Sequence, residues 1–111
     1  MSARLNATTV AAALGAADTA AFLARRPQMF REARGRALGG AVGLVLWTGL
    51  AATSALDGKK AGIATLALSQ AVLAGSLAIL AVHLRRGVAG PRVFLGAALS
   101  IAAAGDTLRR R

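Results

Sequence analysis

The chain has 111 residues, a formal net charge of +10 and no cysteine. This length allows one domain, 1–111, and the missing cysteines exclude a disulfide scaffold, a thiol nucleophile and a cysteine-ligated metal site. Because 56% of the residues are hydrophobic but only 4% are aromatic, the chain is too apolar to stay disordered and has few large side chains for a soluble core. This composition predicts a small, basic, all-α membrane protein.

The first apolar stretch, 5–24, is long enough to cross a bilayer as a helix. Asn6, two threonines and Asp18 make it more polar than an ordinary span, so a secretory signal peptide is the rival interpretation. An acid inside the stretch and the lack of a small-x-small cleavage site before Arg25 argue against the signal peptide. We therefore expect a first membrane-spanning helix here.

Two further stretches, 37–56 and 61–82, contain 20 and 22 residues without one ionisable group. Each can cross the roughly 30 Å hydrocarbon layer as a helix that satisfies its own backbone hydrogen bonds. Because only residues 57–60 separate them, the two helices must be antiparallel neighbours.

The last stretch, 91–108, begins with a proline suited to the first turn of a helix and is 18 residues long, about 27 Å. Its strongly apolar part, 93–105, has only 13 residues. The segment therefore either crosses the bilayer with a short apolar length or stays half inserted. The pattern predicts an integral membrane bundle of four transmembrane helices arranged as two hairpins, or three helices if the last segment does not cross.

Short loops rich in lysine and arginine stay in the cytoplasm. This places the connections 25–36 and 83–90 inside the cell, and the second cytoplasmic loop extends to residue 92, so that it covers 83–92. Four spans put 8 basic residues inside and 6 outside, whereas a last segment that does not cross gives 11 inside and 3 outside. Charge therefore favours a segment that does not cross, and hydropathy favours crossing. Either way, we expect a protein of the cell (cytoplasmic) membrane.

The basic connections are also expected to contact a bilayer with anionic headgroups, where each cation near the surface contributes about 1 kcal/mol. The arginines concerned are Arg25, Arg26, Arg31, Arg34, Arg36, Arg85, Arg86 and Arg92. Nucleic acid is not an expected partner, because these arginines lie at the ends of apolar stretches and Phe30 is the only aromatic residue among them.

Asp18 is the most informative single residue, because an acid inside a span is costly and indicates a pathway or a pairing. Counted along the helices, it could meet Gln70 in an intramembrane polar site. The structural alternative is that Asp18 pairs with Arg25 or Arg26 near the cytoplasmic end. For Asp106, the neighbouring arginines 109–111 provide a simple salt pairing.

Close helix packing in lipid depends on small residues, and the candidates are Gly39, Gly43, Ala71 and Gly75. The sequence shows no catalytic set, phosphate-binding loop, cofactor motif or metal-ligand spacing. We therefore expect no enzyme activity and no cofactor.

These features predict a non-catalytic, multi-pass accessory or assembly subunit of a larger membrane complex. Its partner is another membrane protein, or a second copy of the chain. The alternative is a homo-oligomeric small transporter or channel in which Asp18 and Gln70 line a polar path.

Overall fold

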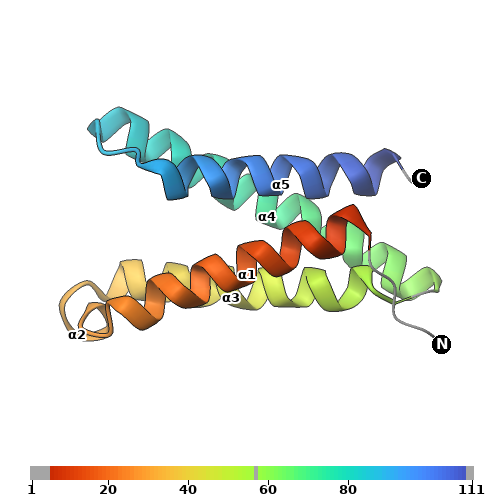
Figure 1. Cartoon of the computed structure of the whole chain (residues 1–111), viewed down its shortest axis with the longest axis horizontal. Coiled ribbons are helices and arrows are strands. Elements are labelled where there is room, and N and C mark those ends of the chain that lie inside the picture. Colours follow the sequence, from red (N-terminus) through yellow and green to blue (C-terminus); the bar gives the residue numbers. More distant parts are fainter. Residues whose placement is uncertain (1–5, 57, 110–111) are drawn as a thin grey trace.

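The computed structural model describes residues 6–56 and 58–109, with only the backbone of residues 29 and 30. Four long helices and one short helix make up this part of the chain (Figure 1). They are α1 (Ala7–Arg25), α2 (Met29–Glu32), α3 (Arg34–Ser54), α4 (Lys59–Arg86) and α5 (Pro91–Arg109). The expected all-α class is confirmed.

Several helices are longer than the apolar stretches that predicted them, because basic residues at their ends remain helical. The clearest case is α4, which has 28 residues where the uncharged stretch has 22. Among the described residues, three helices are long and apolar enough to cross a membrane: α1, α3 and α4. The fourth long helix, α5, is not among these three, and its charged residues Arg92, Asp106 and Arg109 lie near its two ends.

Local signals set the helix ends. The Asn6 side chain accepts a hydrogen bond from the Thr9 N–H at 2.9 Å and so begins α1. α4 ends at Arg86, and the left-handed backbone of Gly87 (φ 69°) lets the chain turn back so that N–H groups after the helix bond to carbonyls of its last turn. Pro91 then opens α5, where its missing N–H is not needed.

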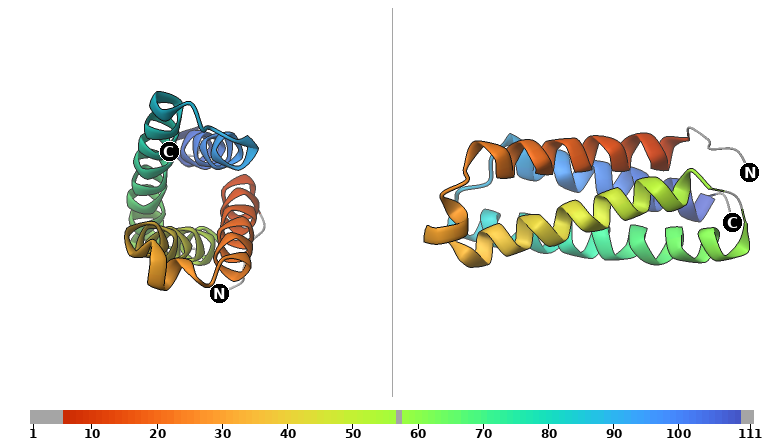
Figure 2. Two further views of the ribbon diagram at one scale, coloured as in Figure 1. Left: turned by 90° about the vertical axis from the view of Figure 1, so that its left-hand side faces the viewer. Right: turned by 90° about the horizontal axis from the view of Figure 1, so that it is seen from below.

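The four long helices run alternately up and down and form a ring. Both α1 and α4 pack against α3 and α5, so α1 and α4 lie at opposite corners (Figure 2). The turn between α3 and α4 makes them antiparallel neighbours, as the sequence predicts. We refer to the end where α1 begins and α5 ends as the terminal end, and to the end that carries 26–33 and 87–90 as the basic end (Figure 1).

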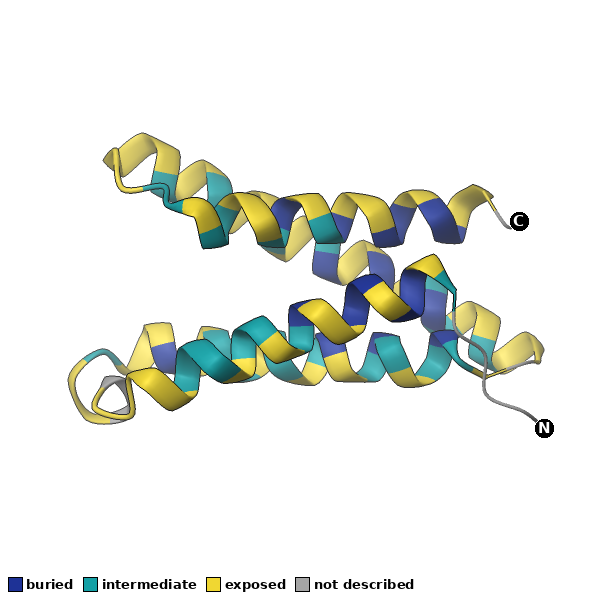
Figure 3. Ribbon diagram, viewed as in Figure 1, coloured by how far each residue is buried: buried dark blue, intermediate teal, exposed yellow. Residues whose placement is uncertain are grey.

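Burial is concentrated toward the terminal end (Figure 3). In α1 no residue after Gly15 is buried, in α4 none after Val72, and in α5 none before Ala97. The largest buried side chains of the core cluster are Trp47 and Leu50, and most of the others are alanines. The helices are therefore packed more closely in the terminal half than in the basic half.

Candidate functional site

At the terminal end, α1 and α5 share a buried carboxylate. Asp106 is 9% exposed and accepts hydrogen bonds from the Thr8 hydroxyl at 2.6 Å and from the Thr8 backbone N–H at 3.2 Å. Thr8 is in the first turn of α1, where N–H groups lack partners within the helix and the helix dipole favours a negative charge. The expected pairing of Asp106 with the C-terminal arginines is present for Arg109, at 3.2 Å. Asp106 thus joins the end of α5 to the beginning of α1.

Hydroxyl groups connect the other helices at the same end. Thr9 of α1 and Ser54 of α3 hydrogen-bond at 2.8 Å, and Thr65 of α4 donates to Thr53 of α3 at 3.0 Å. In the described part of the chain, no buried side-chain nitrogen or oxygen lacks a hydrogen-bond partner. The described part of the chain therefore satisfies its own buried polar side chains.

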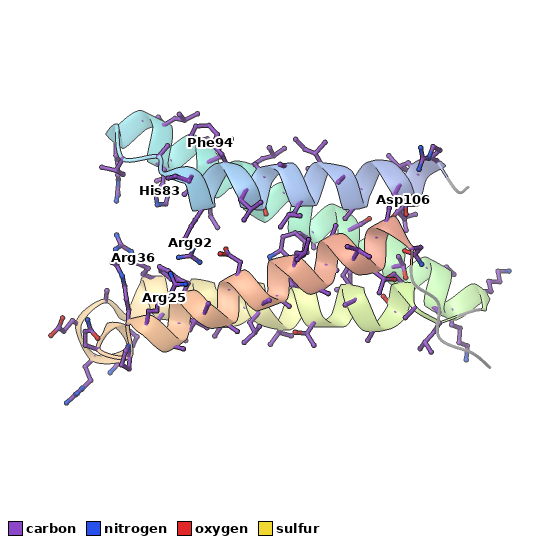
Figure 4. The ribbon with its side chains drawn as sticks, in the orientation of Figure 1. Arg25, Arg36, His83, Arg92, Phe94 and Asp106 are labelled. Carbon is purple, nitrogen blue, oxygen red and sulfur yellow. The ribbon has the colours of Figure 1, made fainter. Side chains whose placement is uncertain are left out.

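Nearer the basic end, Asp18 of α1 forms an ion pair with Arg92, which points from α5 toward α1 (Figure 4). The Arg92 Nε and Nη2 atoms donate to the two carboxylate oxygens, each at 3.1 Å. This two-pronged geometry is the strong form of an arginine–carboxylate pair. The guanidinium carbon also lies 4.3 Å from the ring centroid of Phe22, one turn further along α1. The side chains of Arg92 and Asp18 are 39% and 31% exposed, so the pair is half-buried.

The structure does not bring Asp18 and Gln70 together. Asp18 faces α5, whereas Gln70 is exposed on α4, at the opposite corner of the ring. Arg25 and Arg26 are exposed at the end of α1, and the acid pairs with Arg92 in their place. The partner of Asp18 therefore comes from a segment far along the chain.

The arginines expected to contact lipid headgroups lie at the basic end. Seven of the eight are exposed and have no acidic partner within the described part. These seven are Arg25, Arg26, Arg31, Arg34, Arg36, Arg85 and Arg86. Arg92 is the eighth and is occupied by Asp18. Positive charge without a partner is thus concentrated at one end of the bundle.

Of the four residues expected to pack helices, Gly39, Ala71 and Gly75 are exposed, whereas Gly43 is half-buried and faces Thr19 of α1. A Cβ atom added at Gly39 or Gly75 would meet nothing within 4 Å, and at Gly43 the nearest atom would be 4.0 Å away. Ala71 is exposed on α4, close to Gly75. The bundle makes a much closer helix contact at Gly15. Three of the four candidate packing residues, Gly39, Ala71 and Gly75, are therefore exposed on the surface of the bundle.

Groups suited to metal chemistry do not converge in residues 6–56 and 58–109. No three of the His, Cys, Asp and Glu residues described there lie close enough to hold a metal ion. The His83 ring contacts its own helix, with Nδ1 2.8 Å from the Ile79 carbonyl oxygen. No protein-family model, curated protein or solved structure matches this chain. The site must therefore be interpreted from its own geometry.

Sequence reasoning selects Asp18 but misses its partner and misses Thr8. A threonine near a helix start is common and carries no signal of its own. Arg92 could have been found from charge matching, because α1 holds an acid in its interior and α5 begins with an arginine. Both contacts lie along the seam between α1 and α5.

Proposed function

We propose that the chain is a four-span protein of the cytoplasmic membrane, with the connections 25–36 and 83–90 in the cytoplasm. The distribution of side chains supports this, because it is the reverse of that in a soluble protein. Alanines and hydroxyl residues fill most of the buried positions, whereas Val42, Val45 and Ile101 are more than half exposed. Lipid chains would cover such an apolar outer surface.

The fourth span is α5, whose 13 uncharged residues between Arg92 and Asp106 cover about 20 Å. This is less than the hydrocarbon thickness, so both charged side chains would lie at its margins. Charged groups at that depth are tolerated when they are paired. Asp18 and Thr8 provide the two partners, which supports insertion of α5 beside α1.

Within the membrane, we propose that the chain acts as a non-catalytic accessory subunit that packs against another membrane protein. The observation that carries this proposal is the outer face of α4, which combines small side chains with an amide. Small residues let a second helix approach closely, and an amide in lipid gains from a hydrogen-bonding partner. The residues of this α4 outer face, all exposed, are Ala67, Gln70, Ala71, Ala74, Gly75 and Ala78.

Enlarging Gly75 tests the role of the α4 outer face. The variant Gly75→Leu leaves the bundle itself intact, because nothing lies within 4 Å of a Cβ atom at this position. A leucine would hold a partner helix away from the α4 backbone. We expect the wild-type chain to co-purify from its membrane in mild detergent with a defined larger protein, identified by mass spectrometry, and the variant to lose it.

Gly105→Leu is the matched control, because Gly105 is exposed on α5 and also has nothing within 4 Å of an added Cβ. This control should keep the partner. A Gly75→Leu variant that retains the same partner as the wild type would contradict the proposal. A wild-type chain that is isolated only as a homo-oligomer, without another protein, would favour the alternative, a small transporter or channel.

The transporter or channel alternative receives less support from the geometry. A polar path would need Asp18 and Gln70 on one surface, but they lie on different sides of the ring. Asp18 is also neutralised by Arg92. We therefore place the accessory role first.

A further inference from the structure

At the basic end, α4 continues past its apolar stretch. The uncharged segment 61–82 has 22 residues and a length of about 33 Å, close to the hydrocarbon thickness. Arg85 and Arg86 follow Val82 by three and four residues, so they lie about 5 Å further along the helix axis. In the proposed orientation, this is the depth of the lipid phosphate groups on the cytoplasmic side.

A hollow of about 330 Å³ lies at this point and is lined by Val82, Arg85 and Arg86. Their spacing of three and four residues places the arginines on the same side of α4 as the valine. Val82 is 44% exposed and supplies the apolar part of the lining. The hollow therefore combines two guanidinium groups with apolar surface, which matches the boundary between a headgroup and its acyl chains.

The chain itself does not neutralise these two guanidinium groups. Neither Arg85 nor Arg86 has an acidic partner within the described part. The acids nearest the basic end are Asp18, which is paired with Arg92, and Glu32, which is exposed on α2. A counter-charge for the hollow must therefore come from outside the described chain.

We propose that the hollow formed by Val82, Arg85 and Arg86 binds the phosphate group of an anionic phospholipid in the cytoplasmic leaflet. Guanidinium groups donate to phosphate oxygens in a two-pronged geometry that an ammonium group cannot make. Anionic lipids give that leaflet its negative surface potential. The proposal rests on the membrane orientation given above and not on the identity of a protein partner.

Native mass spectrometry of the full chain in mild detergent tests the proposal, with phosphatidylglycerol and phosphatidylcholine as added probes. We expect the wild type to retain one phosphatidylglycerol in preference to phosphatidylcholine. The double variant Arg85→Gln/Arg86→Gln should weaken that retention roughly tenfold. Lys59→Gln/Lys60→Gln is the matched control, because it removes the same charge from the opposite end of α4 and should retain the lipid.

All four substituted side chains are exposed, so both double variants should keep the helical circular dichroism of the wild type. Equal weakening in the two double variants would overturn the proposal, because only net charge would then matter. Unchanged retention in the arginine variant, or an acidic protein bound at the arginines in place of lipid, would overturn it as well. The isolated chain is used, so a failure here is distinct from a failure of the Gly75→Leu experiment.

Discussion

Gly15 of α1 makes a close contact with α3, because the indole ring of Trp47 lies directly against it. A Cβ atom added at Gly15 would overlap three ring atoms of Trp47. Trp47 is 6% exposed, so it belongs to the core and does not lie on the outer surface of the bundle. Sequence alone leaves both roles open for a tryptophan in mid-span, because hydropathy does not show which side of a helix is covered.

The contact predicts that Gly15→Ala destabilises the bundle. Overpacking of this kind typically costs about 1–3 kcal/mol, because the ring or the helix must shift. Reversible unfolding in mixed detergent measures the effect, and Gly96→Ala serves as the control, since nothing lies within 4 Å of a Cβ at Gly96. A Gly15→Ala variant at least as stable as the control would contradict this interpretation.

The long helices are predictable from the sequence because long uncharged stretches bounded by charge leave little alternative. For example, 61–82 lies wholly inside α4. The helix contacts are not predictable in the same way, since 74 residues separate Asp18 from Arg92 and 98 separate Thr8 from Asp106. Alanine-rich helices offer many equivalent faces for packing. The order of the helices around the ring therefore depends on contacts between distant side chains, which the hydrophobic periodicity of each helix does not encode.

In the four-span arrangement proposed above, the seam between α1 and α5 predicts that Asp18 helps to hold α5 across the membrane. The variant Asp18→Asn leaves Arg92 without its acidic partner, and the balance of basic residues then favours a cytoplasmic C-terminus. We expect the fraction of chains with a cytoplasmic C-terminus to rise, as measured with a C-terminal reporter that is active on only one side of the membrane.

Glu32→Gln is the control for the loss of one negative charge, because Glu32 is exposed on α2. It should leave the C-terminus where it is in the wild type, as should Asp18→Glu, which keeps a carboxylate. If Asp18→Asn and the wild type give the same reporter signal, the ion pair does not determine the insertion of α5.

At the scale of the whole molecule, the two ends of the bundle differ. Buried residues and hydroxyl contacts are concentrated at the terminal end, whereas the half-buried Asp18 and Arg92 lie toward the basic end. The exposed arginines gather at that same basic end. In the orientation proposed above, we therefore expect water from the cytoplasmic side to enter the basic half of the bundle more readily than the terminal half.

Two serines on the inner side of α4 allow this difference to be measured. Ser69 is fully buried, whereas Ser76, two turns nearer the basic end and on the same side of the helix, is half-buried. Because the chain has no cysteine, Ser69→Cys and Ser76→Cys each introduce a single thiol of similar size. In membrane vesicles with the cytoplasmic side outward, we expect a charged maleimide to label position 76 at least tenfold faster than position 69. Equal labelling rates would mean that water reaches both halves of the bundle to the same extent. The exposed arginines would then indicate the orientation of the chain but not a difference in water access.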